Sequence, residues 1–286
     1  MKYNLIVILN LKYNTINSFK YVNQEGVLFL NPVAFSVFGL PIRWYGILIS
    51  LGVLIGVIIA QYNCKYRDVN YDILFNAVMI VLPCGIVGAR AYYVLFKWSY
   101  YRDHINEIIN IREGGLAFHG GLILALIGAF IYFRYKKVNI FKMFDVSVPS
   151  IVLAQALGRW GNFFNQEAYG RAVSEEFIKH FPKFIQNGMF IEGTYYHPTF
   201  LYESSWNLCV FILLMILLRK SDKKGIVFFT YVGLYSIGRF FVEGLRTDSL
   251  MLGSFRIAQL VSLVGVIIWL GAMCYYFINK KSNIKE

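Results

Sequence analysis

The chain has 286 residues, of which 57% are hydrophobic and only 15% are charged, and its formal net charge at pH 7 is +12. Soluble domains are typically about half apolar and about a quarter charged, so this composition argues against a soluble protein. The positive charge could indicate a nucleic-acid partner, but most Lys and Arg residues lie in segments between apolar runs. We therefore predict a membrane protein with no nucleic-acid partner.

Seven apolar runs predict seven membrane-spanning helices. Windows of about 19 residues place them at 46–62, 73–96, 115–135, 146–163, 198–218, 226–242 and 257–278. Each run is near the roughly 20 residues that a helix needs to cross about 30 Å of hydrocarbon. The predicted fold class is therefore all-α, a polytopic integral membrane protein.

The remaining segments predict the domain organisation. We expect an N-terminal extension or arm at 1–30, a transmembrane domain at 31–278 and a tail at 279–286. The apolar stretch LIVIL near the N-terminus is too short for a secretory signal and has no cleavage site after it, so residues 1–43 are expected to be soluble or interfacial. The loop at 164–197 carries mixed charges and is expected to form a small extracytoplasmic head.

Basic residues predict the orientation. The loops at 63–71, 134–142 and 219–224, with the tail at 279–286, hold 13 Lys and Arg residues but 3 acidic ones. The segments on the other side are longer, and their basic residues are less dense. Because cytoplasmic loops are enriched in Lys and Arg, we expect the N-terminus outside and the C-terminal tail in the cytoplasm.

Four arginines lie in or at the mouth of a predicted span: Arg43, Arg90, Arg159 and Arg239. Arg43 is expected to be an interfacial anchor. An arginine at the centre of a span costs about 2.5–3.5 kcal/mol on insertion scales, so the other three need partners or a ligand. They could be tied to a carboxylate or to helix-end carbonyls, or they could bind an anion.

The predicted orientation brings the polar residues of six helices to one depth, in the outer half of the membrane. They are Tyr45, Arg90, His119, Arg159, Glu203 and Arg239. Independent structural ties would be scattered in depth. We therefore expect one polar cavity that faces the outer leaflet.

Three motifs line this expected cavity. EGGLAFHGGL (113–122) places His119 among glycines, which allow close approach of a backbone or ligand; the histidine could be structural, or a base near neutral pH. YSIGRFFVEGLR (235–246) places Tyr235, Arg239 and Glu243 on one helical face, with Arg246 three residues further. That face could be a self-satisfied ion ladder, or it could orient one arginine while leaving donors free for a ligand.

The third motif is GRWGNFFNQEAYG (158–170). Arg159 can offer two parallel donors to a phosphate. Asn162, Asn165 and Glu167 follow at the expected level of the headgroups. Together the three motifs suit a phosphate-containing lipid.

Groups for other chemistries are missing from the sequence. No Ser or Cys stands beside His119, and HExxH, paired metal-binding acids and a P-loop are absent. The four cysteines have no CxxC spacing, so no metal site, cofactor or disulfide is expected. Any nucleophile is expected to arrive with a second substrate.

These motifs resemble the prolipoprotein diacylglyceryl transferase family. Residues 158–170 fit its signature G-R-x-G-N-F-x-N-x-E-x-x-G at every fixed position, including Gly158 and Gly170. Further blocks occur in the same order along about residues 30–278: IRWYG (42–46), HGGL (119–122), HPTFLYE (197–203) and RFFVEGLR (239–246).

The resemblance implies an enzyme of the bacterial cytoplasmic (inner) membrane, with its active site facing the outer leaflet, that catalyses the first step of lipoprotein maturation. It would transfer the diacylglyceryl group of phosphatidylglycerol to the lipobox cysteine of a prolipoprotein, giving a thioether and glycerol phosphate. The expected partners are phosphatidylglycerol, the lipobox peptide and membrane lipids. The family's essential histidine corresponds to His119, its two essential arginines to Arg159 and Arg239, and its tyrosines to Tyr45 and Tyr235.

We hypothesise that Arg159 and Arg239 bind the phosphate, while His119 takes the thiol proton, orients the thiol or binds the headgroup. The candidate substrate-binding residues are Tyr45, Arg90, Gly158, Arg159, Asn162, Asn165, Glu167, Gly170, Tyr235, Glu243 and Arg246. Two alternatives remain at this point. An anion transporter would need a polar path to the cytoplasm, which the apolar inner halves of the spans lack. A non-catalytic lipid-binding protein would give His119 no task.

Overall fold

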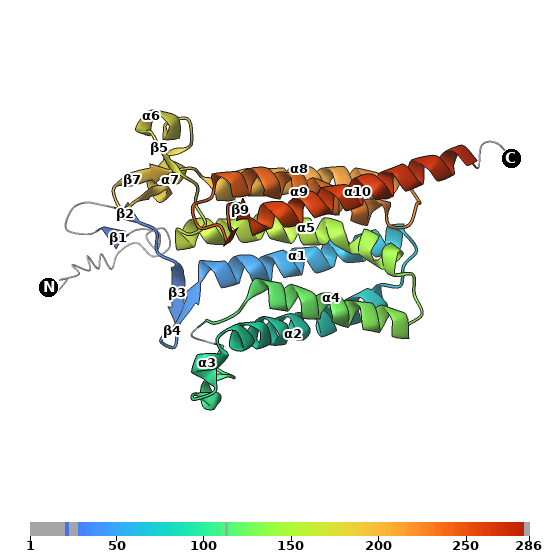
Figure 1. The fold of residues 1–286 in the computed structure, drawn as a ribbon, viewed down its shortest axis with the longest axis horizontal. Helices are drawn as coiled ribbons and strands as arrows, with labels where there is room; N and C mark the ends of the chain where they lie inside the picture. Colours follow the sequence, from blue (N-terminus) through green and yellow to red (C-terminus); the bar gives the residue numbers. More distant parts are fainter. Residues whose placement is uncertain (1–20, 23–27, 112–113, 283–286) are drawn as a thin grey trace. The chain divides into compact units, whose positions relative to one another are not determined.

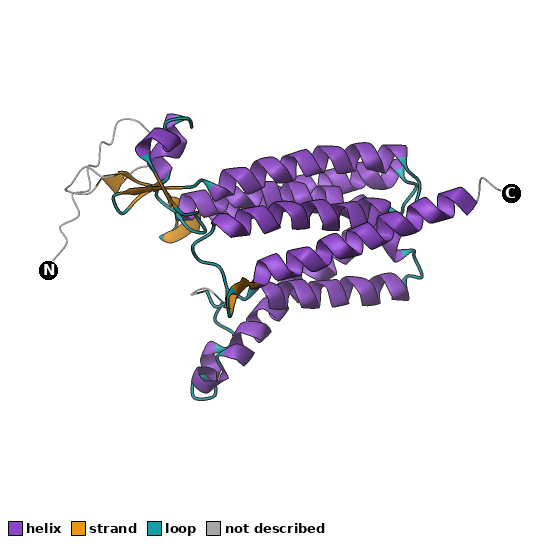
Figure 2. Ribbon diagram, turned by 45° about the horizontal axis from the view of Figure 1, so that its top comes forward, coloured by secondary structure: helices purple, strands orange, loops and turns teal. Residues whose placement is uncertain are grey.

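The computed structural model describes residues 21–22, 28–111 and 114–282. Most of the predicted N-terminal extension (1–30) and the last four residues of the predicted tail lie outside the described residues. The described residues divide into two compact units, the first formed by those up to 59 together with 147–282, the second by those within 60–146. Long helices make up most of each unit (Figures 1 and 2).

Seven helices in the described part of the chain are long and apolar enough to cross a membrane, which confirms the predicted fold class. The observed helices extend beyond several predicted spans, because polar end residues that a hydropathy window excludes still form helical turns. The seven helices are α1 (Trp44–Tyr66), α2 (Tyr71–Phe96), α4 (Phe118–Tyr135), α5 (Ile140–Asn165), α8 (Thr199–Lys220), α9 (Ile226–Leu245) and α10 (Ile257–Ser282).

In the second unit, α2 and α4 pack against each other through glycines. A Cβ on Gly120 would collide with the carbonyl of Gly88, and a Cβ on Gly121 would lie 2.8 Å from the Gly85 carbonyl oxygen. Small residues at these positions let the two backbones approach closely. The loop between the two helices holds α3 (Trp98–Tyr101) and the 3₁₀ helix η1 (Ile105–Glu107).

In the first unit, α9 packs against both α8 and α10 (Figure 1). Gly238 makes room for the Trp206 indole, whose Nε1 donates to the Leu234 carbonyl at 2.8 Å. A buried apolar cluster joins α5, α8 and α9; it comprises Val148, Val152, Val210, Leu214, Leu218 and Val227. This packing fixes the relative positions of the three helices that carry the candidate site.

Residues 164–197, which were predicted to form a small head and are called the head below, are folded. The head contains α6 (Glu175–Ile178), α7 (Lys183–Gly188) and an antiparallel sheet of order β5-β7-β6. The strands are β5 (Ala172–Val173), β6 (Phe190–Ile191) and β7 (Thr194–Tyr196). Its core packs onto the C-terminal end of α5 and the N-terminal end of α8 through Phe163, Ile178, Ile185, Met189 and Phe200.

Short hairpins that the sequence analysis did not predict precede two spans (Figure 2). The strands β3 (Val33–Val37) and β4 (Leu40–Arg43) lead directly into α1, and β8 (Met251–Leu252) and β9 (Phe255–Arg256) lead into α10. A further pair, β1 (Tyr21–Val22) and β2 (Leu28–Phe29), precedes them. Strands of two to five residues leave no signal in a hydropathy window of helical length.

Candidate active site

The signature segment 158–170 forms the end of α5 and the turn that leaves it. Gln166 has a φ of +49° and closes the helix: its N–H donates to Phe163 O, and the N–H of Glu167 donates to Asn162 O. This is the Schellman ending, in which residues of the last helical turn and the following turn come into contact. Here that contact is polar, since Asn162 Nδ2 donates to Glu167 Oε1 at 2.9 Å.

The central feature of the first unit is one carboxylate shared by two arginines. Glu203 on α8 pairs through Oε2 with Nε of Arg159 on α5, and through Oε1 with Nη1 of Arg239 on α9, the latter at 2.7 Å. Only 8% of the Glu203 side chain is exposed, against 21% and 19% for the two arginines. Arg159 and Arg239, called the arginine pair below, are thus held together by a nearly buried anion.

A second carboxylate completes the cluster. Glu243 lies one turn beyond Arg239 on α9 and its Oε2 is 2.5 Å from Arg239 Nη2. Arg246 is 3.9 Å from the same Glu243 oxygen, but donates to both Asp248 carboxylate oxygens, at 2.9 and 2.7 Å. Burial raises the Asp248 pKa, but hydrogen bonds from Arg246 outweigh it and hold that pKa below its usual value. The row of charged groups on this helical face therefore continues to Asp248.

Arg159, Arg239, Glu203 and Glu243 form what we call the charge cluster, with two positive and two negative charges. Each guanidinium has five N–H donors. The contacts with Glu203, Glu243 and Asn162, the last at 3.4 Å from Arg159 Nη1, use only part of these donors. Because the arginine side chains are partly exposed and the carboxylates are not, the open side of the charge cluster can accept an anion.

Two glycines of the signature differ in what they do. A Cβ on Gly161 would collide with the Tyr45 ring, so Gly161 makes room for that tyrosine. No described atom lies within 4 Å of a Cβ built on Gly158, so the packing of the described residues does not require a glycine there. A side chain at position 158, next to Arg159 in the chain, would therefore extend into open space.

Polar contacts continue along α5, one turn before Arg159, and along α9, two turns before Arg239, at residues that the sequence analysis did not single out. Gln155 Nε2 donates to the Tyr231 hydroxyl at 2.9 Å, and the Tyr231 ring lies 5.7 Å from that of Tyr235. Gln155 precedes Arg159 by four residues, and Tyr231 precedes Tyr235 by four. This i, i+4 spacing is a signal that could have identified both residues.

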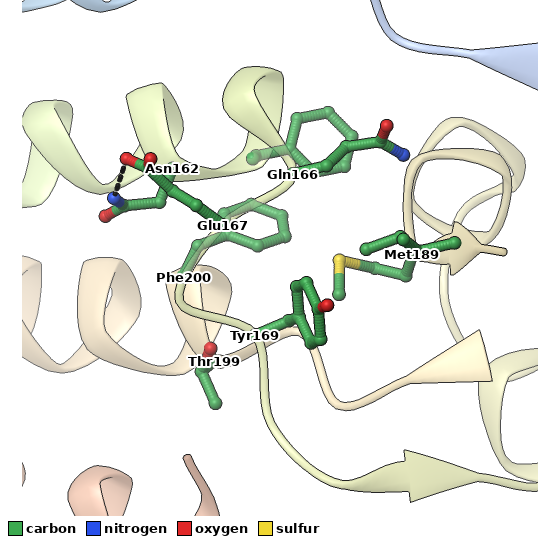
Figure 3. A pocket seen from close by; sticks show the side chains of 9 residues that line it. Asn162, Gln166, Glu167, Tyr169, Met189, Thr199 and Phe200 are labelled. Carbon is green, nitrogen blue, oxygen red and sulfur yellow. Dashed lines mark hydrogen bonds between the residues drawn. The ribbon is translucent and has the colours of Figure 1, made fainter. Parts of the chain in front are cut away.

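A small cavity lies between the C-terminal end of α5, which carries Arg159, and the head (Figure 3). At about 10 Å³ it is close to the least volume that admits one water molecule, so it is too small for a lipid headgroup. Asn165, nearby on α5, has a buried Oδ1 without a hydrogen-bond partner among the described residues. The cavity is lined by Asn162, Phe163, Gln166, Glu167, Tyr169, Met189, Ile191, Thr199 and Phe200.

Gly170 has a structural role. Its N–H donates to His197 O at 3.0 Å, it forms a β-bridge with Arg246, and a Cβ there would lie 2.6 Å from the His197 Cβ. His197 is half-buried beside the Phe177 ring, and its Nδ1 lies 3.2 Å from the Tyr202 hydroxyl. Burial lowers the His197 pKa. These contacts tie the head to the ends of α8 and α9.

Arg90, in the second unit, is held by backbone carbonyls. Its guanidinium donates to the carbonyl oxygens of Glu107, Ile108, Gly114 and Gly115 at 2.6 to 3.2 Å. Its Cζ also lies 5.1 Å from the centre of the Tyr101 ring. The sequence left open whether Arg90 is a structural tie or an anion ligand, and these contacts are those of a structural tie for the loop that precedes α4.

His119 is the second residue of α4 and is exposed. Its ring meets the Phe118 ring edge-on at 5.9 Å. Ala117, just before α4, donates its N–H to the carbonyl oxygen of Ala89 on α2 at 2.9 Å. Ala89 directly precedes Arg90, so this hydrogen bond holds the start of α4 against the part of α2 that carries Arg90. The other histidines contact their own segments: His104 stacks on Tyr100, and His180 Nδ1 is 3.0 Å from Phe177 O. Among the described residues, no three His, Cys, Asp or Glu side chains are grouped to hold a metal ion.

These features define a helical membrane protein with an open, partly buried arginine–carboxylate cluster. A model of the prolipoprotein diacylglyceryl transferase family matches residues 32–275. A Clostridium botulinum (strain Langeland) protein called phosphatidylglycerol–prolipoprotein diacylglyceryl transferase is 59% identical over 254 residues, which are 89% of this chain and 99% of that protein. A Clostridium kluyveri protein of the same name is 55% identical over 246 residues, 86% of this chain and 96% of that protein.

The chain therefore belongs to the prolipoprotein diacylglyceryl transferase family. This confirms the family and the enzyme class predicted from the motifs. Of the alternatives weighed on the sequence, neither the anion transporter nor the non-catalytic lipid-binding protein is favoured by these comparisons.

Proposed function

We propose that the chain transfers the diacylglyceryl group of phosphatidylglycerol to the thiol of the lipobox cysteine of a prolipoprotein. Family membership and the names of the relatives support this activity. The structural observation that carries it is the arginine pair, joined by Glu203 and partly exposed. A guanidinium can donate two parallel hydrogen bonds to the oxygens of a phosphate group, and here two guanidiniums pair with the same carboxylate.

The arginine pair stabilises the charge that the reaction creates. The sulfur attacks the carbon of the diacylglyceryl group that carries the phosphate oxygen, and a C–S bond forms. The C–O bond breaks and its electron pair goes to the phosphate, which leaves as glycerol phosphate. Fixed donors in a site of low dielectric constant are most effective where charge develops, and loss of one such donor typically costs about 10²–10³-fold in rate.

His119 takes up the thiol proton in this proposal. A free thiol has a pKa of about 8.5 and reacts as the thiolate, so a base that accepts its proton accelerates the attack. Imidazole suits this task near neutral pH. The exposed position of His119 at the start of α4 supports the assignment, because a buried imidazole could not meet a substrate thiol.

The other candidate residues surround the headgroup. Asn162, Asn165 and Glu167 lie beyond Arg159 at the end of α5, and Tyr45 fits against Gly161. Tyr235 lies one turn before Arg239 on α9. The contacts of Arg90 and Gly170 instead support structural roles for these two.

The chain is oriented in the cytoplasmic membrane with the N-terminus and the head outside and the tail inside, so the arginine pair faces the outer leaflet. The density of Lys and Arg in the loops at 63–71, 134–142 and 219–224 supports this orientation. The head follows the same end of α5 that carries Arg159. A prolipoprotein exported across the membrane would therefore meet the site on the side where its lipobox emerges.

The test uses purified protein in detergent with phosphatidylglycerol and a lipobox peptide, and follows the peptide mass. We expect a gain of one diacylglyceryl unit that depends on the peptide cysteine and on the lipid. A folded sample that never modifies the peptide, although it binds the lipid, would contradict the proposal.

A further inference from the structure

Glu203 raises a question that the proposed function leaves open, because a carboxylate stands between the two groups that are meant to bind phosphate. Its two oxygens pair with different arginines, from α5 and α9. Only 6% of the residue is exposed, and it lies one turn inside α8. An ionised carboxylate is costly to bury, and this one pairs with the same two guanidiniums that are proposed to bind the anionic substrate.

The charge of the cluster gives the reason for this arrangement. With Glu203 and Glu243 the four charges cancel, whereas the arginine pair with Glu243 alone would carry one positive charge. The substrate phosphate is a diester with one negative charge. The product is a phosphate monoester, whose second ionisation lies near pH 6, so it carries close to two negative charges at neutral pH.

We infer that Glu203 is an internal counter-ion that lets the charge cluster hold a phosphodiester monoanion but release a phosphomonoester dianion. The inference rests on the proposed function and extends it to product release. Glu203 acts through the arginines and is therefore a positioning residue. It orients the guanidiniums and also sets how much negative charge the site retains.

The same step that forms the product creates the charge that Glu203 opposes. When the C–O bond breaks, the phosphate oxygen keeps the bonding electron pair, and the thiol proton passes to His119 or to water. The phosphate thus gains one negative charge beside a carboxylate that is already fixed between the arginines. Stabilisation in the transition state comes from the guanidiniums, and repulsion by Glu203 grows until glycerol phosphate leaves.

Two water-soluble probes separate this role from a purely structural one. Glycerophosphoglycerol is the headgroup diester, with one negative charge, and glycerol phosphate is the product, with nearly two at pH 8. Calorimetric titration of the full-length protein in detergent measures both affinities at pH 5.5 and pH 8 without requiring turnover. The wild-type protein is expected to bind the diester equally at both pH values and glycerol phosphate more weakly at pH 8.

Variants then test the residue. E203Q keeps the side-chain size but removes the charge. It should bind glycerol phosphate at pH 8 at least about tenfold more tightly than wild type. This change corresponds to a modest part of the repulsion energy between two unit charges about 4 Å apart. The increase should be smaller at pH 5.5. E203D, which keeps the charge, should restore the wild-type preference for the diester. E175Q makes the same chemical change in an exposed pair with Lys179 and should have no effect.

Two outcomes would overturn the inference. One is E203Q that binds glycerol phosphate no more tightly than wild type, which would mean that Glu203 only holds the arginines. The other is a wild-type protein that prefers the monoester dianion, a result that needs no variant. The proposed function has a separate readout, since it fails only if the wild-type protein does not modify the lipobox peptide.

Discussion

Glu203 Oε1 accepts a hydrogen bond from Arg239 Nη1 at 2.7 Å, which joins α8 to α9 inside the first unit. The other oxygen of the same carboxylate pairs with Arg159 on α5. The positions of both arginines thus depend on one residue of a third helix. Three segments that are far apart in the sequence, around residues 159, 203 and 239, form one site for this reason.

The arginine pair should not tolerate lysine. R159K and R239K keep the charge but lose the planar fork that contacts a carboxylate and a phosphate at once. Each change is expected to lower transfer to the lipobox peptide by about 10²-fold or more. The peptide mass assay measures this loss. R219K, at the opposite end of α8, serves as the control and should keep its activity; an R239K variant as active as R219K would rule out a bidentate role.

Loss of the imidazole should separate chemistry from lipid binding. We expect H119Q to lower transfer by about 10²–10⁴-fold while phosphatidylglycerol still binds. The measurements are peptide mass and lipid retained by the purified protein. H104Q changes an exposed histidine of the same unit and should behave as wild type. Unchanged transfer in H119Q would remove the base role, and loss of bound lipid would make His119 a headgroup ligand.

The helices and the residue types of the site could be predicted from the sequence, but the contacts between site residues on different helices could not. Long apolar runs predict spans because a helix must satisfy its own backbone in lipid. The sequence also indicates that buried arginines need partners, yet spacing alone connects only residues of one helix, such as Arg239 and Glu243. The pairing of Glu203 with Arg159 and Arg239 depends on packing between α5, α8 and α9, which no local pattern encodes.

Arg90 illustrates the same limit in the second unit. Its position in a span predicted either a ligand or a tie, and only the fold shows the carbonyls of residues 107, 108, 114 and 115 around it. The short hairpins before α1 and α10 were missed because two-residue turns and short strands carry little hydropathy contrast.

Replacing Arg90 should destabilise the protein. R90M leaves four carbonyl groups without their donor, and hydrogen bonds to a charged group contribute about 1.5–3 kcal/mol each, with incomplete additivity. We expect a fall in Tm of several degrees in detergent, together with lower activity. R134M, an exposed position at the end of α4, is the comparison and should change Tm little. A stable R90M protein that has lost lipid binding alone would instead make Arg90 a ligand.

Gly158 and Gly161 of the signature should differ in their response to replacement by alanine. G158A meets no described atom and gains about 1 kcal/mol in helix propensity, so Tm should hold or rise. Its transfer rate should nevertheless fall, because the added methyl group occupies the space beside Arg159. G161A collides with the Tyr45 ring and should lower Tm. Equal activity of G158A and wild type would show that no ligand uses this space.

The head should lose stability in mild acid. Burial lowers the pKa of His197 in the folded protein, so the unfolded chain takes up its proton more readily. The contribution of neutral His197 to the free energy of unfolding is therefore fully present above the pKa of histidine in the unfolded chain, about 6.5. It is lost as the pH falls through the lowered pKa of the folded protein. The Tm should fall between pH 7.5 and pH 5, and this fall should be smaller in H197N. A decrease of the same size in H197N would assign the effect to other groups.

The most direct test of the account is whether the arginine pair holds the phosphate of the lipid. Native mass spectrometry can count lipids on wild type, R159Q and R239Q after incubation with phosphatidylglycerol or with diacylglycerol, which lacks the phosphate. We predict that wild type retains one phosphatidylglycerol that both variants lose, while diacylglycerol binding is the same in all three. Equal retention of phosphatidylglycerol by folded R159Q, R239Q and wild type would contradict the central claim.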